Sequence, residues 1–396
     1  MTKKLPEGFC ILPFVHMEIQ IQGQVHVCCH TNQPQDMGNL HQQDLQSVWQ
    51  GDQLKDFKRH ILSAQTQKNS HCKDCFYYES LGAKSWRQYE NENWSLYIDD
   101  VLAGSAPSQP KSLSLRFSNL CNFSCRTCRP ATSTGWFKDA LFLNPRGQYQ
   151  KVTSTPSNKS MLSQIEPYLK GLTQIHFVGG EPLMESEHYD ILERLASVNP
   201  DIEITYDTNL SILSLGDREV IPLWNQFKKV NLSASIDGLG EKGEFIRKGL
   251  DWNSFLKNWN RVKEEAPHVR LMNNFTLSVY NMFHVLEFIE FIHESDFYHG
   301  QDLKDFSVTL VEEPKWQSLQ ILPPDLKKEL RRRYQNFPLR HLGRVAEDLD
   351  NAISYMEGAD QSQLLGIFRN FNKKLDLIRA ENFSKLFREE AQCLGF

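Results

Sequence analysis

Short apolar runs of strand length recur along the middle of the chain, separated by stretches in which apolar residues return every three or four positions. The runs are Leu113–Phe117, Gln174–Val178, Ile202–Tyr206, Val230–Ile236, Phe275–Val279 and Phe306–Val311. The helical stretches include Tyr189–Ala196, Phe255–Glu264 and Met282–His293. Repeated strand–helix units predict an α/β region with a parallel sheet, either open or a partial barrel, and chemistry at the C-terminal ends of its strands.

The N-terminal part of the chain has a different pattern. Apolar and polar residues alternate, turn at a glycine and alternate again, which predicts a hairpin. The apolar positions are Val15, Met17, Ile19 and Ile21 before Gly23, and Val25 and Val27 after it. Helical spacing follows at Leu45, Val48, Trp49, Phe57 and Ile61, with a break near Gly51. A hairpin with one or two helices makes a thin core, so we expect a metal cluster to stabilise this part.

Two further changes in pattern divide the chain. Residues 104–110 are rich in glycine, serine and proline, which is typical of a linker. Near the C-terminus, Leu375, Ile378, Phe383, Leu386 and Phe387 have roughly helical spacing. We therefore expect a hairpin-plus-helix domain over 1–80, a linker over 81–110, the α/β domain over 111–315 and a helical region over 316–396.

Charge and hydropathy exclude some partners. The 44 Lys and Arg residues are outnumbered by 49 Asp and Glu residues, for a formal net charge of −5, which argues against a nucleic-acid backbone as the main partner. The start of the chain lacks the apolar core of a secretory signal, and no apolar run reaches the roughly 18 residues of a membrane span. We expect a cytoplasmic protein without a membrane segment.

The cysteines point to metal chemistry. The chain has 9 of them, an odd number, and most lie in tight groups in its first third. This distribution fits a secreted disulfide framework poorly, whereas grouped cysteines in a reducing compartment often bind metal. Buried free thiols are the alternative, and that alternative suits Cys393 and one of Cys28 and Cys29.

One group, Cys121-x3-Cys125-x2-Cys128, directly follows the first predicted strand of the α/β region. Three thiolates on one loop can face a single [4Fe-4S] cluster, whose usual ligand is thiolate. Three ligands leave one iron open, and an open metal position is typical of a catalytic site. A zinc knuckle is the alternative, but zinc would need a fourth Cys or His nearby, and the next histidine is His176.

This motif after the first strand of a (β/α) domain resembles the signature of the radical S-adenosylmethionine (SAM) superfamily, and the resemblance covers about residues 111–313. It implies a partial (β/α)6 barrel with SAM bound at the open iron. It also implies reductive cleavage of SAM to a 5′-deoxyadenosyl radical, which takes a hydrogen atom from the substrate. A flavodoxin or ferredoxin would supply the electron.

Further segments resemble the SAM-binding motifs of the family. Gly179-Gly180-Glu181-Pro182, after the second strand, is similar to the GGEP motif, whose backbone and carboxylate hold the SAM amino group. Glycines allow close backbone approach and a carboxylate can pair with an ammonium. The segment 233–238 is similar to the Ser-x-Asp-Gly stretch, which implies that Ser233 and Ser235 contact SAM through its carboxylate or ribose.

Two other positions match less completely. Arg247 resembles the arginine that binds the SAM carboxylate, for which a guanidinium is suited, although a surface helix position is the alternative. Asn209 resembles the middle of the family's Thr-Asn-Gly turn, but Leu210 replaces the glycine. The residue before the third cysteine is usually aromatic in the family and is Thr127 here, so we expect the adenine contact from Phe123 or from the last strand.

The N-terminal cysteines resemble a twitch domain, a shortened SPASM domain that binds an auxiliary [4Fe-4S] cluster. The implied ligands are Cys10, Cys28, Cys72 and Cys75, with Gly23 at the matching position between the first two. Four ligands would leave no open iron, so an electron-transfer or structural role follows. The order is unusual because these domains commonly follow the barrel. Zinc remains an alternative, since four thiolates suit it equally well.

Three functions are consistent with these features. The first is a dehydrogenase-like oxidoreductase that oxidises a small molecule, such as a sugar or cyclitol alcohol, by two electrons. The second is a peptide- or protein-modifying enzyme, and the lack of an evident leader-binding domain before the barrel favours the first over it. The third is a non-catalytic iron–sulfur or zinc protein. No catalytic base is evident, because Glu312 and Glu313, after the last strand, fit a solvated loop better.

Overall fold

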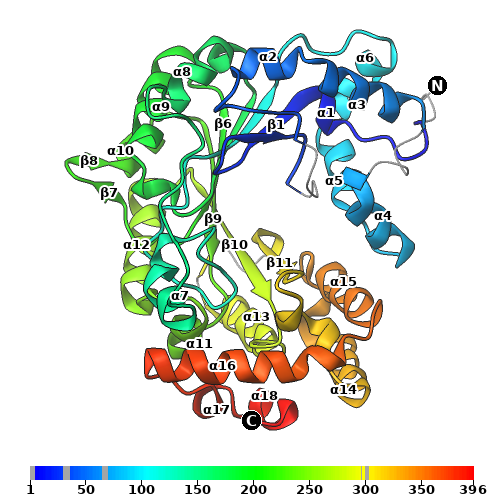
Figure 1. Cartoon of the computed structure of the whole chain (residues 1–396), viewed down its shortest axis with the longest axis vertical. Coiled ribbons are helices and arrows are strands. Elements are labelled where there is room, and N and C mark those ends of the chain that lie inside the picture. Colours follow the sequence, from blue (N-terminus) through cyan, green and yellow to red (C-terminus); the bar gives the residue numbers. More distant parts are fainter. Residues whose placement is uncertain (1–4, 30–35, 65–69, 296, 299–302) are drawn as a thin grey trace. The chain divides into compact units, whose positions relative to one another are not determined.

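The computed structural model describes residues 5–29, 36–64, 70–295, 297–298 and 303–396 (Figure 1). The chain forms two compact units. The first comprises Met1–Asn119, Lys151–Tyr206 and Ser214–Val230, and the second comprises Leu120–Gln150, Asp207–Leu213 and Asn231–Phe396.

A mixed sheet forms the centre of the first unit. Its strands are β1 (His16–Ile19), β2 (Gln24–His26), β3 (Gly38–Asn39), β4 (Ser112–Arg116), β5 (Gln174–Val178) and β6 (Glu203–Thr208). Strands β4, β5 and β6 pair in parallel, and β1 pairs in parallel with the other edge of β4, Met17 beside Leu113. Strand β2 then pairs antiparallel with β1 and with β3. The predicted hairpin is therefore confirmed, and it extends the parallel strands.

Helices of the first unit bury apolar faces. In α9 (Ser186–Val198) the residues Tyr189, Leu192 and Leu195 are buried at helical spacing, which accounts for its formation. Helix α9 contacts its neighbours α8 and α10, which are drawn in green with it in Figure 1. The helices are α1 (Leu12–Val15), α2 (Leu45–Trp49), α3 (Asp52–Leu62), α4 (Lys73–Ser80), α5 (Trp86–Asn93), α6 (Ile98–Leu102), α8 (Met161–Ile165), α9 and α10 (Val220–Trp224).

The second unit contains three further parallel strands among its described residues, β9 (Lys229–Ser235), β10 (Arg270–Leu277) and β11 (Phe306–Leu310). Leu271, Asn273, Phe275 and Leu277 are buried while Met272, Asn274 and Thr276 are partly exposed, which is the alternation expected of a strand. Helices α11 (Gly240–Ile246), α12 (Trp252–Glu265) and α13 (His284–Glu294) connect these strands, and α7 (Phe137–Leu143) precedes them.

The C-terminal region of the second unit is helical, as predicted. It comprises α14 (Pro324–Gln335), α15 (Val345–Glu357), α16 (Leu365–Arg379), α17 (Phe383–Leu386) and α18 (Arg388–Leu394). Buried aromatic rings hold it together, with Phe383 stacked on Phe387 at 5.4 Å and Phe245 of α11 stacked on Phe383 at 6.0 Å. None of the helices in the described ranges is both long and apolar enough to span a membrane.

All six strands predicted for the α/β region occur, as β4, β5, β6, β9, β10 and β11, so the parallel α/β class is confirmed. Strand β10 begins five residues before its predicted start. The alternation of buried and exposed positions extends upstream, with Arg270, Met272 and Asn274 on the more exposed side. The segment expected to be a linker contains α5 and α6. His16 and Glu18, predicted on a polar strand face, are buried instead, with His16 Nδ1 2.9 Å from Oγ of Ser112 and Glu18 paired with Arg116 at 2.9 Å.

Candidate functional site

The loop that carries the three predicted cluster ligands belongs to the second unit. A hydrogen bond between the thiols of Cys125 and Cys128 raises the pKa of Cys125 and lowers that of Cys128. Cys121 lies near enough to raise the pKa of Cys128 by charge repulsion. The three thiols thus influence one another's ionisation on one loop, and their joint ligation of a cluster remains a prediction.

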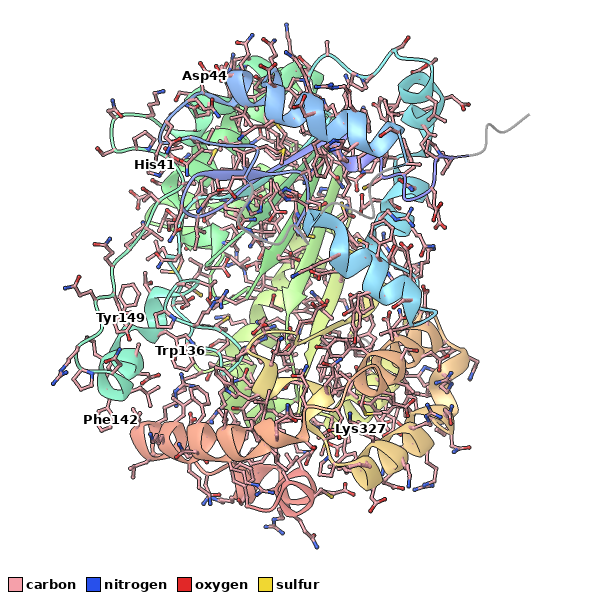
Figure 2. The ribbon with its side chains drawn as sticks, turned by 45° about the vertical axis from the view of Figure 1, so that its right-hand side comes forward. His41, Asp44, Trp136, Phe142, Tyr149 and Lys327 are labelled. Atoms are coloured by element: carbon pink, nitrogen blue, oxygen red, sulfur yellow. The ribbon has the colours of Figure 1, made fainter. Side chains whose placement is uncertain are left out.

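Backbone hydrogen bonds hold this loop against the segment after α11. The N–H of Ser124 donates to the carbonyl of Lys248 at 2.8 Å, and the N–H of Arg126 donates to the carbonyl of Ile246 at 2.7 Å. This pairing places Cys125 opposite Arg247. On the other side, Trp136 of the 3-10 helix Thr134–Trp136, labelled in Figure 2, donates its indole N–H to the Cys125 carbonyl at 2.8 Å.

Arg247 is a buried cation close to the predicted cluster ligands. Its Nε lies 2.8 Å from Oδ2 of Asp237, and its side chain is 12% exposed, so the surface alternative is wrong. Burial alone would lower the pKa of the guanidinium, but Asp237, Cys125 and Cys128 raise it well above its ordinary value. The arginine thus stays charged beside two thiols. Binding of the SAM carboxylate by Arg247 remains a prediction.

Asn209 also reaches the cysteine loop. Its side-chain Nδ2 donates to Oδ1 of Asn122 at 2.9 Å and lies 3.9 Å from Sγ of Cys121. The next residue, Leu210, adopts a left-handed φ of 52° and is fully buried. At the position where the family's turn has glycine, the leucine thus adopts a backbone conformation that favours glycine.

Ser233 and Ser235 lie two residues apart on β9, so their side chains point to the same face of the strand. In the parallel register Ser233 is beside Met272 and Ser235 is beside Asn274. Ser233 is buried and Ser235 is partly exposed. The two serines thus form a polar patch on one face of β9, and their contact with SAM remains a prediction.

The GGEP segment lies in the first unit, after β5. Gly179 has a φ of 124°, a conformation that favours glycine, and an added Cβ would contact Cβ of Arg116 at 3.4 Å. Pro182 begins a short 3-10 helix, Pro182–Met184, and Oε1 of the buried Glu181 accepts from the N–H of Leu183 at 3.1 Å. Gly180 donates to the carbonyl of Ser118 at 3.4 Å. These bonds order the motif locally.

The N-terminal cysteines form a second group, within the first unit. Burial raises the pKa of Cys10 well above its ordinary value, and the nearby thiols of Cys28, Cys72 and Cys75 raise it further. Burial, with Cys28 and Cys75, raises the pKa of Cys72 to about 12. Ligation of a cluster by these four thiols remains a prediction, and Cys29 is exposed.

Helix α5, which lies in the segment predicted to be a linker, forms hydrogen bonds with the residues next to Cys10 of this second group. The Asn91 amide donates to the carbonyl of Phe9 at 2.9 Å and accepts from the N–H of Ile11 at 2.9 Å, so it holds both neighbours of Cys10. Arg87 donates to the same Phe9 carbonyl at 2.9 Å. The sequence contains no motif that would have marked these residues.

The donor chemistry suits iron–sulfur clusters. Both groups consist of cysteine sulfur, the ligand that such clusters prefer, and in a cubane each thiolate binds a different iron. Within the described segments, no three His, Cys, Asp or Glu side chains are arranged to hold a metal ion. Phe123, expected near the adenine, is 1% exposed and lies under Gly249, where an added Cβ would be 2.7 Å away. It therefore acts as a core residue.

Two families match the chain. A family model described as an iron–sulfur cluster-binding domain (SPASM) matches residues 10–76, and one described as the radical SAM superfamily matches residues 115–292. Together they cover both cysteine groups and every predicted SAM-binding residue.

Curated relatives and solved structures are more distant. A GTP 3′,8-cyclase of Mycolicibacterium smegmatis is 30% identical over 98 residues, 24% of this chain and 24% of the cyclase. A GTP 3′,8-cyclase of Campylobacter curvus is 25% identical over 187 residues, 45% of this chain and 51% of the cyclase. The chain thus spans between a quarter and a half of the length of these relatives.

Among solved structures, anSMEcpe with bound AdoMet is 19% identical, with a TM-score of 0.40 over 58% of this chain and 61% of that chain. SuiB of Streptococcus suis bound to S-adenosylmethionine is 18% identical, with a TM-score of 0.39 over 75% of this chain and 63% of that chain. On the family matches, this chain belongs to the radical SAM superfamily and carries an SPASM-type domain before its radical SAM domain, with [4Fe-4S] clusters and SAM as cofactors.

Proposed function

We propose that this radical SAM enzyme oxidises a small molecule by two electrons, using a [4Fe-4S] cluster on Cys121, Cys125 and Cys128. The observation that supports the proposal is that Cys121, Cys125 and Cys128 share one loop, which is hydrogen-bonded to the segment carrying Arg247, a cation paired with Asp237 at 2.8 Å. These three cysteines would hold the cluster, which, once reduced by a flavodoxin or ferredoxin, would supply reductive cleavage of SAM and a radical able to take a hydrogen atom from the substrate.

The chain itself supplies position and charge. Arg247, held by Asp237, keeps a positive charge beside the thiolate ligands and lowers the cost of their ionisation. Asn209 directs an amide N–H at Cys121, and hydrogen bonds to cluster sulfurs tune the potential of iron–sulfur clusters. We propose that Gly179, Gly180, Glu181 and Pro182 hold the SAM amino group, with Ser233, Ser235 and Arg247 toward its carboxylate and ribose.

The second cysteine group suggests the type of reaction. Removing one hydrogen atom oxidises a substrate by one electron, so a two-electron oxidation also needs an electron acceptor and loss of a proton. We propose an auxiliary [4Fe-4S] cluster on Cys10, Cys28, Cys72 and Cys75 as that acceptor. Matches to GTP 3′,8-cyclases, whose name states a nucleotide substrate, support the small-molecule class. A peptide substrate is the competing proposal.

The test is formation of 5′-deoxyadenosine by the anaerobically reconstituted, dithionite-reduced protein with SAM. We expect it from the wild type and none from the Cys121→Ala/Cys125→Ala/Cys128→Ala variant. Absence of product from a wild type that holds iron would favour a non-catalytic cluster or zinc protein. Sugars and cyclitols, compared with peptides, should stimulate its formation, and stimulation by peptides alone would replace the small-molecule proposal.

A further inference from the structure

Arg126 lies between two predicted cluster ligands, yet its side chain points away from them into the C-terminal helical region. The guanidinium is completely buried. Its Nη1 donates to Oδ1 of Asn372 at 2.5 Å, and its Nη2 donates to Asp376 at 2.5 Å and to Glu381 at 2.6 Å. Its Cζ also lies 3.6 Å from the ring centre of Phe245. A buried arginine with these partners fixes its own stretch of backbone.

The same region holds the carbonyl groups of the loop. Arg379 donates to the Ser124 carbonyl at 2.7 Å, and Gln317 donates to the Arg126 carbonyl at 2.8 Å. Between them, the Cys125 carbonyl accepts from Trp136, whose ring lies 4.8 Å from Cζ of Arg379. Three consecutive carbonyls around Cys125 are thus held by side chains.

The helix that supplies these contacts presents them on one side. Asn372, Asp376 and Arg379 are four and three residues apart on α16, so they share one helix face. Glu381 lies two residues after the end of the helix and also pairs with Lys248 at 2.7 Å. Asn372, Asp376, Arg379 and Glu381 lie outside both matched family regions, which end at residues 76 and 292.

We propose that the C-terminal region acts as a clamp on the cluster loop, and that Arg126 is the positioning residue through which it acts. The clamp consists of Gln317, Asn372, Asp376, Arg379 and Glu381. Its role is to keep Cys125 in place so that the cluster held by Cys121, Cys125 and Cys128 is retained. The inference concerns the retention of this cluster and is independent of the substrate proposed above.

The test measures release of iron to a chelator from the anaerobically reconstituted full chain. The Cys121→Ala/Cys125→Ala/Cys128→Ala variant gives the release of the auxiliary cluster alone, so the remainder in each protein belongs to the radical SAM cluster. Arg126→Met removes the guanidinium that bonds the C-terminal region. Gln317→Leu removes the hydrogen bond to the Arg126 carbonyl without changing the charge. Arg340→Met is the matched control, because Arg340 pairs with Asp350 in the same unit without touching the loop.

We expect the radical SAM cluster to be released about tenfold faster in both loop variants, since loss of outer contacts typically weakens metal binding by that factor or more. The auxiliary cluster should be released at the wild-type rate, and Arg340→Met should match the wild type throughout. Unchanged release in Gln317→Leu and Arg126→Met overturns the proposal. Equal acceleration of both clusters also overturns it, because that result indicates general destabilisation.

Discussion

Arg247 and Asp237 form a buried ion pair, with Nε 2.8 Å from Oδ2 and the carboxylate completely inaccessible to solvent. Asp237→Asn leaves the guanidinium buried without its counter-charge, and we expect a loss of about 3–5 kcal/mol in the free energy of unfolding. Denaturant unfolding of the apoprotein measures it. Glu265→Gln, which breaks the exposed pair with Arg261, should cost far less, because exposed ion pairs contribute little to stability. Equal costs for the two variants would contradict the prediction.

The two cysteine groups should bind iron independently. The wild type should hold about eight irons, and replacing Cys121, Cys125 and Cys128 by alanine should leave about four, because each group holds one four-iron cluster. Replacing Cys10, Cys28, Cys72 and Cys75 should also leave about four. Anaerobic iron and sulfide analysis checks both numbers. Zinc in either group would appear as a shortfall in iron with matching zinc.

Leu210 allows the cost of its left-handed backbone to be measured. Leu210→Ala loses a buried side chain, which costs about 2–5 kcal/mol, and keeps the strained conformation. Leu210→Gly loses the same side chain but relieves about 1 kcal/mol of strain. We expect both variants to be less stable than the wild type and the glycine variant to be the more stable of the two. Denaturant unfolding gives the difference, and an alanine variant at least as stable as the glycine variant would contradict it.

Periodicity predicted much of the fold because the buried strands and helices of the α/β region are locally consistent. Strand β5 has the predicted bounds, and α9 and α12 extend their predicted cores at both ends. The hairpin was also predicted, but its burial was not. Alternation cannot show that β1 gains β4 as a second neighbour or that its polar positions become buried, as His16 does, with Nδ1 2.9 Å from Oγ of Ser112.

Short motifs predicted the cysteine loop and its neighbours because their spacing is local. The contacts of Arg126 could not be predicted, since its partner Asn372 is 246 residues away and no spacing rule links them. The same holds for Asn91, which lies in a segment whose composition suggests a linker. The contacts of both residues depend on packing between segments that are distant in the sequence.

Stability should fall as the pH rises because of Glu390. Burial raises the pKa of this carboxyl from 4.5 to about 7, while Lys242 opposes the shift and Glu287 adds to it. The folded protein therefore holds a proton that the unfolded chain releases, so this contribution is present below about pH 4.5 and is lost as the pH rises through about 7. The loss amounts to about 3 kcal/mol.

Glu390→Gln isolates this contribution, because glutamine keeps the shape and cannot titrate. We expect the free energy of unfolding of the wild type to fall between pH 5 and pH 8 by about 3 kcal/mol more than that of the variant. Parallel pH profiles for the two proteins would show that Glu390 titrates normally.

Asn91 should matter for one cluster only. Asn91→Leu removes the two hydrogen bonds that hold the neighbours of Cys10, so we expect iron to fall from about eight toward about four, with the cluster on Cys121, Cys125 and Cys128 retained. Iron analysis and 5′-deoxyadenosine formation follow the two clusters separately. Asn93→Ala, at an exposed position on the same helix, is the control. Full iron content in Asn91→Leu would contradict the prediction.

The pairing of β1 with β4 constrains how the chain can be divided. His16 and its partner Ser112 are 96 residues apart, so during synthesis β1 leaves the ribosome long before the strand that completes it. A fragment beginning at residue 111 would expose the free edge of β4, and unpaired edges promote aggregation. Expression of either cysteine-bearing region alone therefore requires redesign of this edge.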